Sequence, residues 1–418
     1  MSEILIHGAR VVDPSQNLDA IQPIAIRDGR LVDPDSLEHP ITLNLPGKTI
    51  TPGLIDLHVH LREPGQTHKE DIASATAAAA AGGFTTVLAM PNTLPPPDNA
   101  EHVRLIRNLV DDHAAVNVLL SGCLSQNRAG NAPTNATELR DAGCVALSDD
   151  GSTPQDESVM RDIMTQAAKL NLPVIDHCEN LALSKPGVMH QGRIAQLLHL
   201  PGQPREAELS IVRRDLRLAA ETGCHIHLQH LSCRESVELL AQAQAHGVHA
   251  TAEVTPHHLL LTDADCLRYG TLAKMAPPLR EEQDRQTLIA ALRDGIISVL
   301  ATDHAPHTAQ EKAQGWLKAP FGIIGIQQVV PLCLDQLVHT GLLTLPQLIA
   351  RLTTGPASLL ASTTPQLGTL RLGAPAALTI LDLNATHTLT PEASLSRSTN
   401  APWFGRSCRG TVIGIIKP

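Results

Sequence analysis

The chain has 418 residues, which is enough for a full-size catalytic barrel or for two ordinary domains. Its 32 basic and 42 acidic residues give a net charge of -10, which argues against nucleic acid as a partner. Eight cysteines are scattered without a C-x-x-C pair, and neither a signal peptide nor a membrane span is recognisable. We therefore expect a cytoplasmic protein without a membrane partner.

The two ends of the chain share one pattern of predicted elements, and the middle of the chain has another. Residues 1–50 contain short predicted strands such as "EILIHGARVV", and residues 366–418 return to them in "APAALTILDL" and "GTVIGIIKP". Between residues 51 and 365, short apolar runs alternate with helical stretches, several of which end in Gly. Eight such alternations favour an α/β fold with a TIM-like (β/α)8 barrel over residues 51–365. Residues 1–50 and 366–418 should together form a small β domain.

Polar residues follow the predicted barrel strands at the ends that carry the active site in such folds. Within "DLHVHLREPG", His58 and His60 stand at positions i and i+2 of a strand, so both imidazoles lie on one face. The other candidates, in chain order, are Asn92 after the second strand, Asp149 and Asp150 after the fourth, His177 after the fifth, His230 after the sixth and Asp303 after the eighth.

Imidazole and carboxylate groups are the ligands that zinc and related metals use in proteins. A single H-x-H pair is weak evidence for a metal site, because two ordinary polar residues at a strand end explain it equally well. His177 or His230 alone could likewise be a hydrogen-bonded core histidine. Four histidines and two carboxylates on five strands of one barrel face favour a metal site instead. Four other histidines in or after predicted strands, His225, His227, His257 and His258, receive no role.

The motifs at these positions resemble the amidohydrolase superfamily and, within it, the bacterial class I dihydroorotases. The resemblance covers nearly the whole chain and rests on "PGLIDLHVHLREPGQTHKEDIASATAAAAAGGFTTVLAMPNT", "SDDG", "DHCEN", "LQHLS", "TPHH", "PPLR" and "ATDHAPHT". Hydantoinases and allantoinases resemble the chain as well, but they typically carry a carboxylated lysine after strand four. Here that place reads "ALSDDG", which favours dihydroorotases and Asp150 over Asp149 as the bridging ligand.

The resemblance implies zinc, with one or two ions per chain. His58, His60, Asp150 and Asp303 would serve one ion, and His177 and His230, with Asp150 shared, would serve a second. Asp303 would also be the general acid and base. The implied reaction is the reversible cyclisation of N-carbamoyl-L-aspartate to (S)-dihydroorotate in pyrimidine biosynthesis. A homo-oligomer is also expected.

The resemblance also implies substrate contacts outside the ligand set: Arg62 and Asn92 for the substrate carboxylate, with His307, Phe321 and Gly322 as later contacts. For Arg62 there is an independent reason, because a planar guanidinium binds a carboxylate through two parallel hydrogen bonds. The alternative is an ordinary surface ion pair between Arg62 and Glu63.

Three features depart from the dihydroorotase pattern and keep other functions open. Ala276 precedes "PPLR" where the family usually has Asn, Gln327 stands where Glu is frequent, and "GAPAALTILD" lacks the usual acidic residues. One alternative is a non-catalytic scaffold for aspartate carbamoyltransferase, although such chains typically lose the metal ligands. Another is a related hydantoinase or allantoinase. The composition of residues 309–320 permits a mobile loop or an ordinary surface loop.

Overall fold

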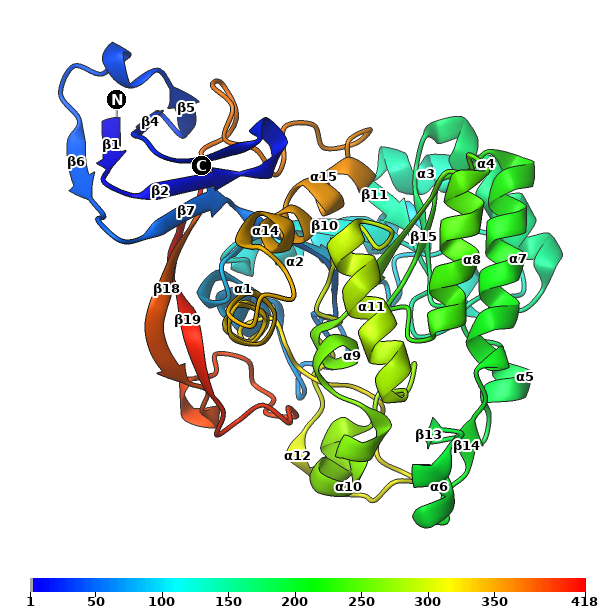
Figure 1. Cartoon of the computed structure of the whole chain (residues 1–418). Helices are drawn as coiled ribbons and strands as arrows, with labels where there is room; N and C mark the ends of the chain where they lie inside the picture. The colour runs from blue at the N-terminus through cyan, green and yellow to red at the C-terminus, as the bar shows by residue number, and fades with distance from the viewer. Residues whose placement is uncertain (1–2) are drawn as a thin grey trace.

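A sheet of eight parallel strands forms the centre of the computed structural model, which describes residues 3–418 (Figure 1). The strands, in spatial order, are β8 (Leu54–Val59), β9 (Phe84–Ala89), β10 (Asn117–Gly122), β11 (Cys144–Leu147), β12 (Val174–Asp176), β15 (Ile226–Leu228), β16 (Ala250–Val254) and β17 (Val299–Leu300). The two edges meet where the His60 backbone N–H donates to the His304 carbonyl oxygen at 3.0 Å. Val59 and His304 also form a parallel bridge. These contacts confirm the predicted barrel.

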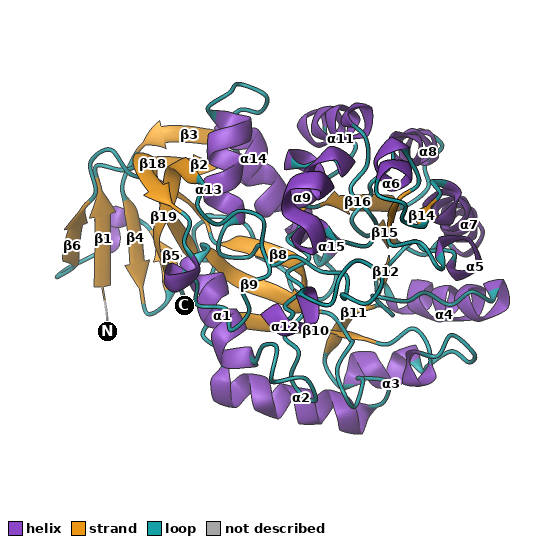
Figure 2. Ribbon diagram, turned by 90° about the horizontal axis from the view of Figure 1, so that it is seen from below, coloured by secondary structure: helices purple, strands orange, loops and turns teal. Residues whose placement is uncertain are grey.

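Helices cover the outside of the strands (Figure 2). They are α1 (Ile72–Ala81), α2 (Ala100–His113), α3 (Ala136–Asp141), α4 (Glu157–Leu170), α7 (Glu206–Thr222), α8 (Arg234–Ala245), α11 (Glu282–Asp294) and α14 (Leu345–Leu352). The short helix α15 (Thr354–Leu359) differs, because its Leu359 packs with apolar residues of the barrel interior such as Ile55. Polar caps begin several of them, as Asp71 does for α1, and left-handed Gly223 and Gly295 end α7 and α11. Among residues 3–418, none of the helices combines the length and the apolar character that crossing a lipid bilayer requires.

The barrel interior has two chemically different sides. Side chains alternate across a strand, so every second residue points inward. On the side of β8 to β12 and β17, a cluster of buried apolar residues fills the interior, including Ile55, Leu88 and Ile175. On the side of β15 and β16, four hydrogen-bonded polar residues follow one another, which we call the polar column: His225, His227, Thr251 and Glu253.

Both chain ends contribute to the small β domain, where the N- and C-terminal strands lie side by side (Figure 1). One sheet contains β5 (Arg30–Val32), β4 (Ile24–Arg27), β1 (Glu3–His7) and β6 (Ile41–Asn44). The other contains β19 (Ser407–Ile416), β18 (Leu378–Thr388), β7 (Thr49–Pro52), β2 (Arg10–Asp13) and β3 (Leu18–Ile21). Antiparallel pairing of β18 with β7 joins the two ends, which confirms the predicted domain. Its division from the barrel at residues 50/51 and 365/366 stays a prediction.

Candidate active site

His58 and His60 lie side by side at the end of β8, both buried. The Nε2 atom of His58 is 3.3 Å from an oxygen of Asp150 and 3.3 Å from an oxygen of Asp303. The Nε2 atom of His60 is 2.9 Å from Asp303 and 3.4 Å from Asp150. Strands β8, β11 and β17 thus bring two imidazoles and two carboxylates to one point.

Asp150 connects this group to the histidines that follow β12 and β15. Its Oδ1 atom lies 3.8 Å from His177 Nδ1 and 3.8 Å from His230 Nε2, and these two nitrogens are 2.9 Å apart. Asp149 points elsewhere, since its carboxylate accepts hydrogen bonds from the backbone N–H groups of Leu124 and Ser125. Of these two aspartates, therefore, Asp150 is the one in a position to bridge two groups of ligands.

The donor atoms fit a metal ion. Asp150 Oδ1 is buried and has no hydrogen-bond partner within residues 3–418, although three imidazole nitrogens lie within 3.8 Å of it. A buried carboxylate oxygen without a partner is unfavourable unless a cation binds it. Three overlapping groups of donors lie within 4.8 Å of one another: His58, His60 and Asp150; His58, His230 and Asp303; and Asp150, His177 and His230. This arrangement can hold one ion or two adjacent ions.

The electrostatics of the cluster favour ionised carboxylates. Burial, the largest single effect, raises the pKa of the Asp150 carboxyl, but the histidines around it, His58, His230 and His60, together outweigh burial and bring this pKa well below 3.8. The pKa of Asp303 is lowered in the same way by His58 and His60. Both groups therefore remain negatively charged at neutral pH and can bind a cation.

A cavity of about 510 Å³ opens onto the cluster. The residues that the sequence singled out as substrate contacts line it together: Arg62, Asn92, His307, Phe321 and Gly322. Asn92 has a second contact, because its Oδ1 atom is 2.9 Å from His60 Nδ1. Ala276 also lines the cavity, so the position where the family usually has Asn faces the same space.

Among residues 3–418, the buried cation Arg62 has no acidic partner in an ion pair. Its Nε donates to the Pro306 carbonyl oxygen at 3.2 Å, and its Nη2 lies 3.3 Å from His307 Nε2. Burial lowers the pKa of Arg62 only to about 10, so the guanidinium stays charged at neutral pH. In the described chain Arg62 forms no ion pair, since the Glu63 carboxylate accepts from the Ile72 backbone N–H instead. The ion-pair alternative for Arg62 is therefore wrong.

Two carboxylates outside the predicted set of site residues contact the histidines of the cluster. Glu253, on β16, lies 2.6 Å from His58 Nδ1, and Glu179 lies 3.0 Å from His177 Nε2. Glu253 had a recognisable signal, because a Glu at an inward position of a buried strand requires a buried partner. Glu179 follows His177 by two residues and carried no comparable signal.

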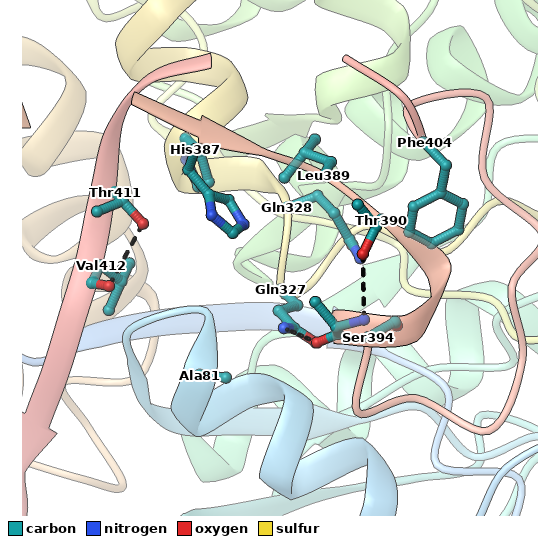
Figure 3. Close-up of a pocket in the computed structure, with 12 residues that line it drawn as sticks. Ala81, Gln327, Gln328, His387, Leu389, Thr390, Ser394, Phe404, Thr411 and Val412 are labelled. Carbon is teal, nitrogen blue, oxygen red and sulfur yellow. Dashed lines mark hydrogen bonds between the residues drawn. The ribbon is translucent and has the colours of Figure 1, made fainter. Parts of the chain in front are cut away.

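Gln327 lies away from the catalytic cavity, in a second cavity of about 140 Å³ between β18, β19 and α13 (Val329–Cys333) (Figure 3). Its Nε2 donates to the Ala393 carbonyl oxygen at 2.8 Å, and its Oε1 accepts from the Leu395 backbone N–H at 2.9 Å. A glutamate could not donate the first of these bonds. The departure at Gln327 therefore concerns the attachment of a loop and leaves the catalytic cavity unchanged.

Sequence comparisons with known proteins agree on one family. A family model described as dihydro-orotase-like matches residues 47–236. A dihydroorotase from Bacillus cytotoxicus is 44% identical over 375 residues, covering 90% of this chain and 87% of the relative. One from Bacillus cereus is 42% identical over 401 residues, covering 94% and 92%.

Among solved structures, L-hydantoinase (dihydropyrimidinase) from Arthrobacter aurescens superposes with a TM-score of 0.90 at 26% identity, covering 100% of this chain and 95% of that one. A dihydropyrimidinase from Brevibacillus agri has a TM-score of 0.84 at 21% identity, which shows a shared fold. The dihydroorotases found by sequence are more similar to this chain, at 42–44% identity, and the matches cover 90–94% of it. With its barrel and its converging histidines and aspartates, the chain belongs to the dihydroorotase family.

Proposed function

We propose that this protein is a zinc-dependent dihydroorotase that interconverts N-carbamoyl-L-aspartate and (S)-dihydroorotate. The observation that carries this proposal is the unpaired Arg62 guanidinium in the same cavity as the His and Asp cluster. Both proposed reactants carry a carboxylate that a guanidinium binds through two hydrogen bonds, whereas hydantoin and allantoin carry none.

A bound zinc ion would lower the pKa of a water molecule to about 7 and polarise the carbonyl oxygen under attack. His58, His60, Asp150, His177, His230 and Asp303 would hold one or two such ions. The side chains of these residues are buried at the base of the cavity, so they are preorganised by the strands that carry them.

Asp303 would transfer the proton. One of its oxygens contacts His60 at 2.9 Å and His58 at 3.3 Å, and Asp303 itself lines the cavity. In the ring-opening direction Asp303 would accept a proton from the attacking water and deliver it to the departing ring nitrogen. In the cyclisation direction the same carboxyl group acts in reverse. Arg62 and Asn92 would meanwhile hold the substrate carboxylate, with His307, Phe321 and Gly322 completing the contacts.

The alternative enzyme is a hydantoinase, which the fold similarity to L-hydantoinase favours. Against a hydantoinase, the segment "ALSDDG" after strand four contains Asp150 and lacks the lysine that hydantoinases typically carry there. The scaffold alternative has no comparable support, because the residues predicted as ligands converge within the cavity. A cytoplasmic location, a homo-oligomer and association with aspartate carbamoyltransferase stay predictions.

The test is a comparison of dihydroorotate, hydantoin and allantoin as substrates, with enzyme that is metal-free and enzyme reconstituted with measured amounts of zinc. We expect zinc-dependent opening of dihydroorotate and little turnover of the other two. Faster turnover of hydantoin would identify the cyclic amidase alternative. Full zinc content without turnover of any substrate would support the scaffold.

A further inference from the structure

The polar column on β15 and β16 ends at the candidate metal site. Going up the barrel, His225 Nε2 lies 3.1 Å from Thr251 Oγ1, and His227 Nδ1 lies 2.9 Å from the same hydroxyl. His227 Nε2 lies 3.3 Å from one oxygen of Glu253. Glu253 then meets His58, so the column connects the barrel interior to a candidate ligand.

Glu253 contacts both groups of candidate ligands. Its Oε1 atom is 2.6 Å from the His58 Nδ1 atom and accepts the His230 backbone N–H at 3.3 Å. Glu253 and His58 are both fully buried, so water does not compete for these bonds. One carboxylate therefore holds the ring of a residue on β8 and the backbone of a residue that follows β15.

The contact also determines which nitrogen of His58 is free. A carboxylate only accepts hydrogen bonds, so the proton of a neutral His58 must lie on Nδ1. The Nε2 lone pair is then directed towards Asp150 and Asp303, each 3.3 Å away. The amide Nε2 of Gln229 is 3.1 Å from His58 Nδ1, but as a donor it cannot take that proton.

We propose that Glu253 is a positioning residue, which fixes the tautomer and the orientation of His58 so that its Nε2 atom binds the metal ion. His227 holds Glu253 in place from below. The proposal rests on the metal site of the proposed function and adds a residue outside the ligand set. Partners of this kind on metal-binding histidines typically contribute 10- to 100-fold to metal affinity or activity.

The test compares Glu253→Leu, Glu253→Gln and Thr251→Val. Glu253→Leu removes the acceptor, whereas Glu253→Gln keeps one oxygen of similar shape. Thr251→Val is the matched control, because it removes two partly buried hydrogen bonds from the same strand and column, and neither of them involves Glu253 or His58. For each protein, zinc affinity is measured by competition with a chromogenic chelator, the visible spectrum of the Co²⁺-loaded form is recorded, and stability is measured by urea unfolding.

We expect zinc affinity to fall by about 10- to 100-fold in Glu253→Leu and by less in Glu253→Gln, with an altered Co²⁺ spectrum in both. Thr251→Val should lose stability and keep both metal properties. Wild-type affinity and spectrum in the Glu253 variants would overturn the proposal and leave the proposed function intact. If Glu253→Leu does not fold, the Co²⁺ spectrum and affinity of Glu253→Gln decide in the same way. A wild-type protein that binds no zinc would overturn both the inference and the proposed function.

Discussion

Three candidate site residues have backbone conformations that side chains of L-residues rarely adopt. Arg62, His230 and Asp303 have φ values of 60°, 32° and 45°. Such conformations typically cost on the order of 1–3 kcal/mol each and persist only where the surroundings enforce them. Each of the three residues lines the catalytic cavity. Three of the ten non-glycine residues with positive φ among residues 3–418 therefore lie where side chains are aimed at one point.

Replacing Asp303 by Asn should abolish most of the turnover. An amide keeps an oxygen near His58 and His60 but cannot carry the proton, so we expect kcat for dihydroorotate to fall by about 10²- to 10⁴-fold. The measurement is steady-state kinetics at matched zinc content, with zinc quantified by mass spectrometry. A kcat close to that of the wild type at equal zinc content would remove Asp303 from proton transfer.

Replacing Arg62 by Lys should impair the use of substrates that carry a carboxylate. Lysine keeps the charge but loses the planar pair of donors, so kcat/KM for dihydroorotate should fall by roughly 10- to 100-fold, equivalent to ~1.4–2.7 kcal/mol. Any residual hydantoin opening serves as the internal control, because that ring has no carboxylate to lose. Equal losses for both substrates would argue for a general distortion of the site.

The candidate ligands could be predicted from the sequence because each stands at the end of a strand, where the barrel geometry itself implies that side chains converge. The role of Glu253 could not, because its contact with His58 joins β8 to β16 across the barrel interior. The second role of Asn92, against His60, also depends on a distance that no spacing in the sequence encodes.

At the scale of elements, the segment after β17 is fixed by two buried ammonium groups. Lys312, at the end of α12 (Ala309–Lys312), donates to the carbonyl oxygens of Lys274, Pro320 and Gly322 at 3.2, 3.0 and 2.9 Å. Lys274 donates to the carbonyl oxygens of two further residues of the segment, Trp316 and Ala319. These bonds hold the backbone next to Phe321, which lines the catalytic cavity.

Lys312→Met should loosen this attachment. Methionine fills similar space but donates no hydrogen bond, so three carbonyl oxygens lose a partner and Phe321 and Gly322 are held less firmly. We expect kcat/KM for dihydroorotate to fall by roughly tenfold, equivalent to ~1.4 kcal/mol, mainly through KM.

The matched control is Lys318→Met, because Lys318 is an exposed residue of the same segment whose side chain has no hydrogen bond or ion pair among the described residues. It should leave the kinetics unchanged. Equal effects of both variants would mean that the bonds of Lys312 do not position the substrate contacts.

The long helices were easier to predict than the short elements above the barrel. α7 and α11 end at Gly223 and Gly295, as their sequences indicated. The pieces at the catalytic end include α5 (Leu181–Ser184), α6 (Arg193–Leu197), β13 (Met189–His190) and β14 (Gly202–Gln203). Elements of two to five residues contain too few positions for a periodic pattern, so their structure depends on contacts made after the barrel has formed.

At the scale of the whole molecule, acid should weaken the fold through histidines that are buried in their neutral form. His190 is 3% exposed, and Arg280 donates to its Nδ1 atom at 3.0 Å, so that atom must be unprotonated. Burial, followed by the charge of Arg280, lowers the pKa of His190 from 6.5 to about 3. Below pH 6.5 the unfolded chain binds this proton and the folded chain does not, so stability falls as the pH decreases.

His190→Gln should reduce this acid sensitivity, because glutamine can accept from Arg280 and does not titrate. Between pH 7 and pH 5, the loss of unfolding free energy should be about 2 kcal/mol smaller in the variant than in the wild type. The measurement is urea unfolding at both pH values with the same metal content. An equal pH dependence in both proteins would show that His190 is already protonated in the fold, or is not the group responsible.

The two sides of the barrel interior set different limits on sequence change. On the apolar side, substitutions between apolar residues of similar volume usually cost less than about 1.5 kcal/mol of stability. Residues such as Ile175 can therefore be substituted one at a time. In the polar column, replacing one residue of a hydrogen-bonded pair leaves the polar group of the other buried without a partner. This costs about 1–3 kcal/mol of folding free energy. His227 and Glu253 must therefore change together or remain as they are. Evolution of new substrate preferences would then be confined to the loops around the cavity mouth, with the column inherited unchanged.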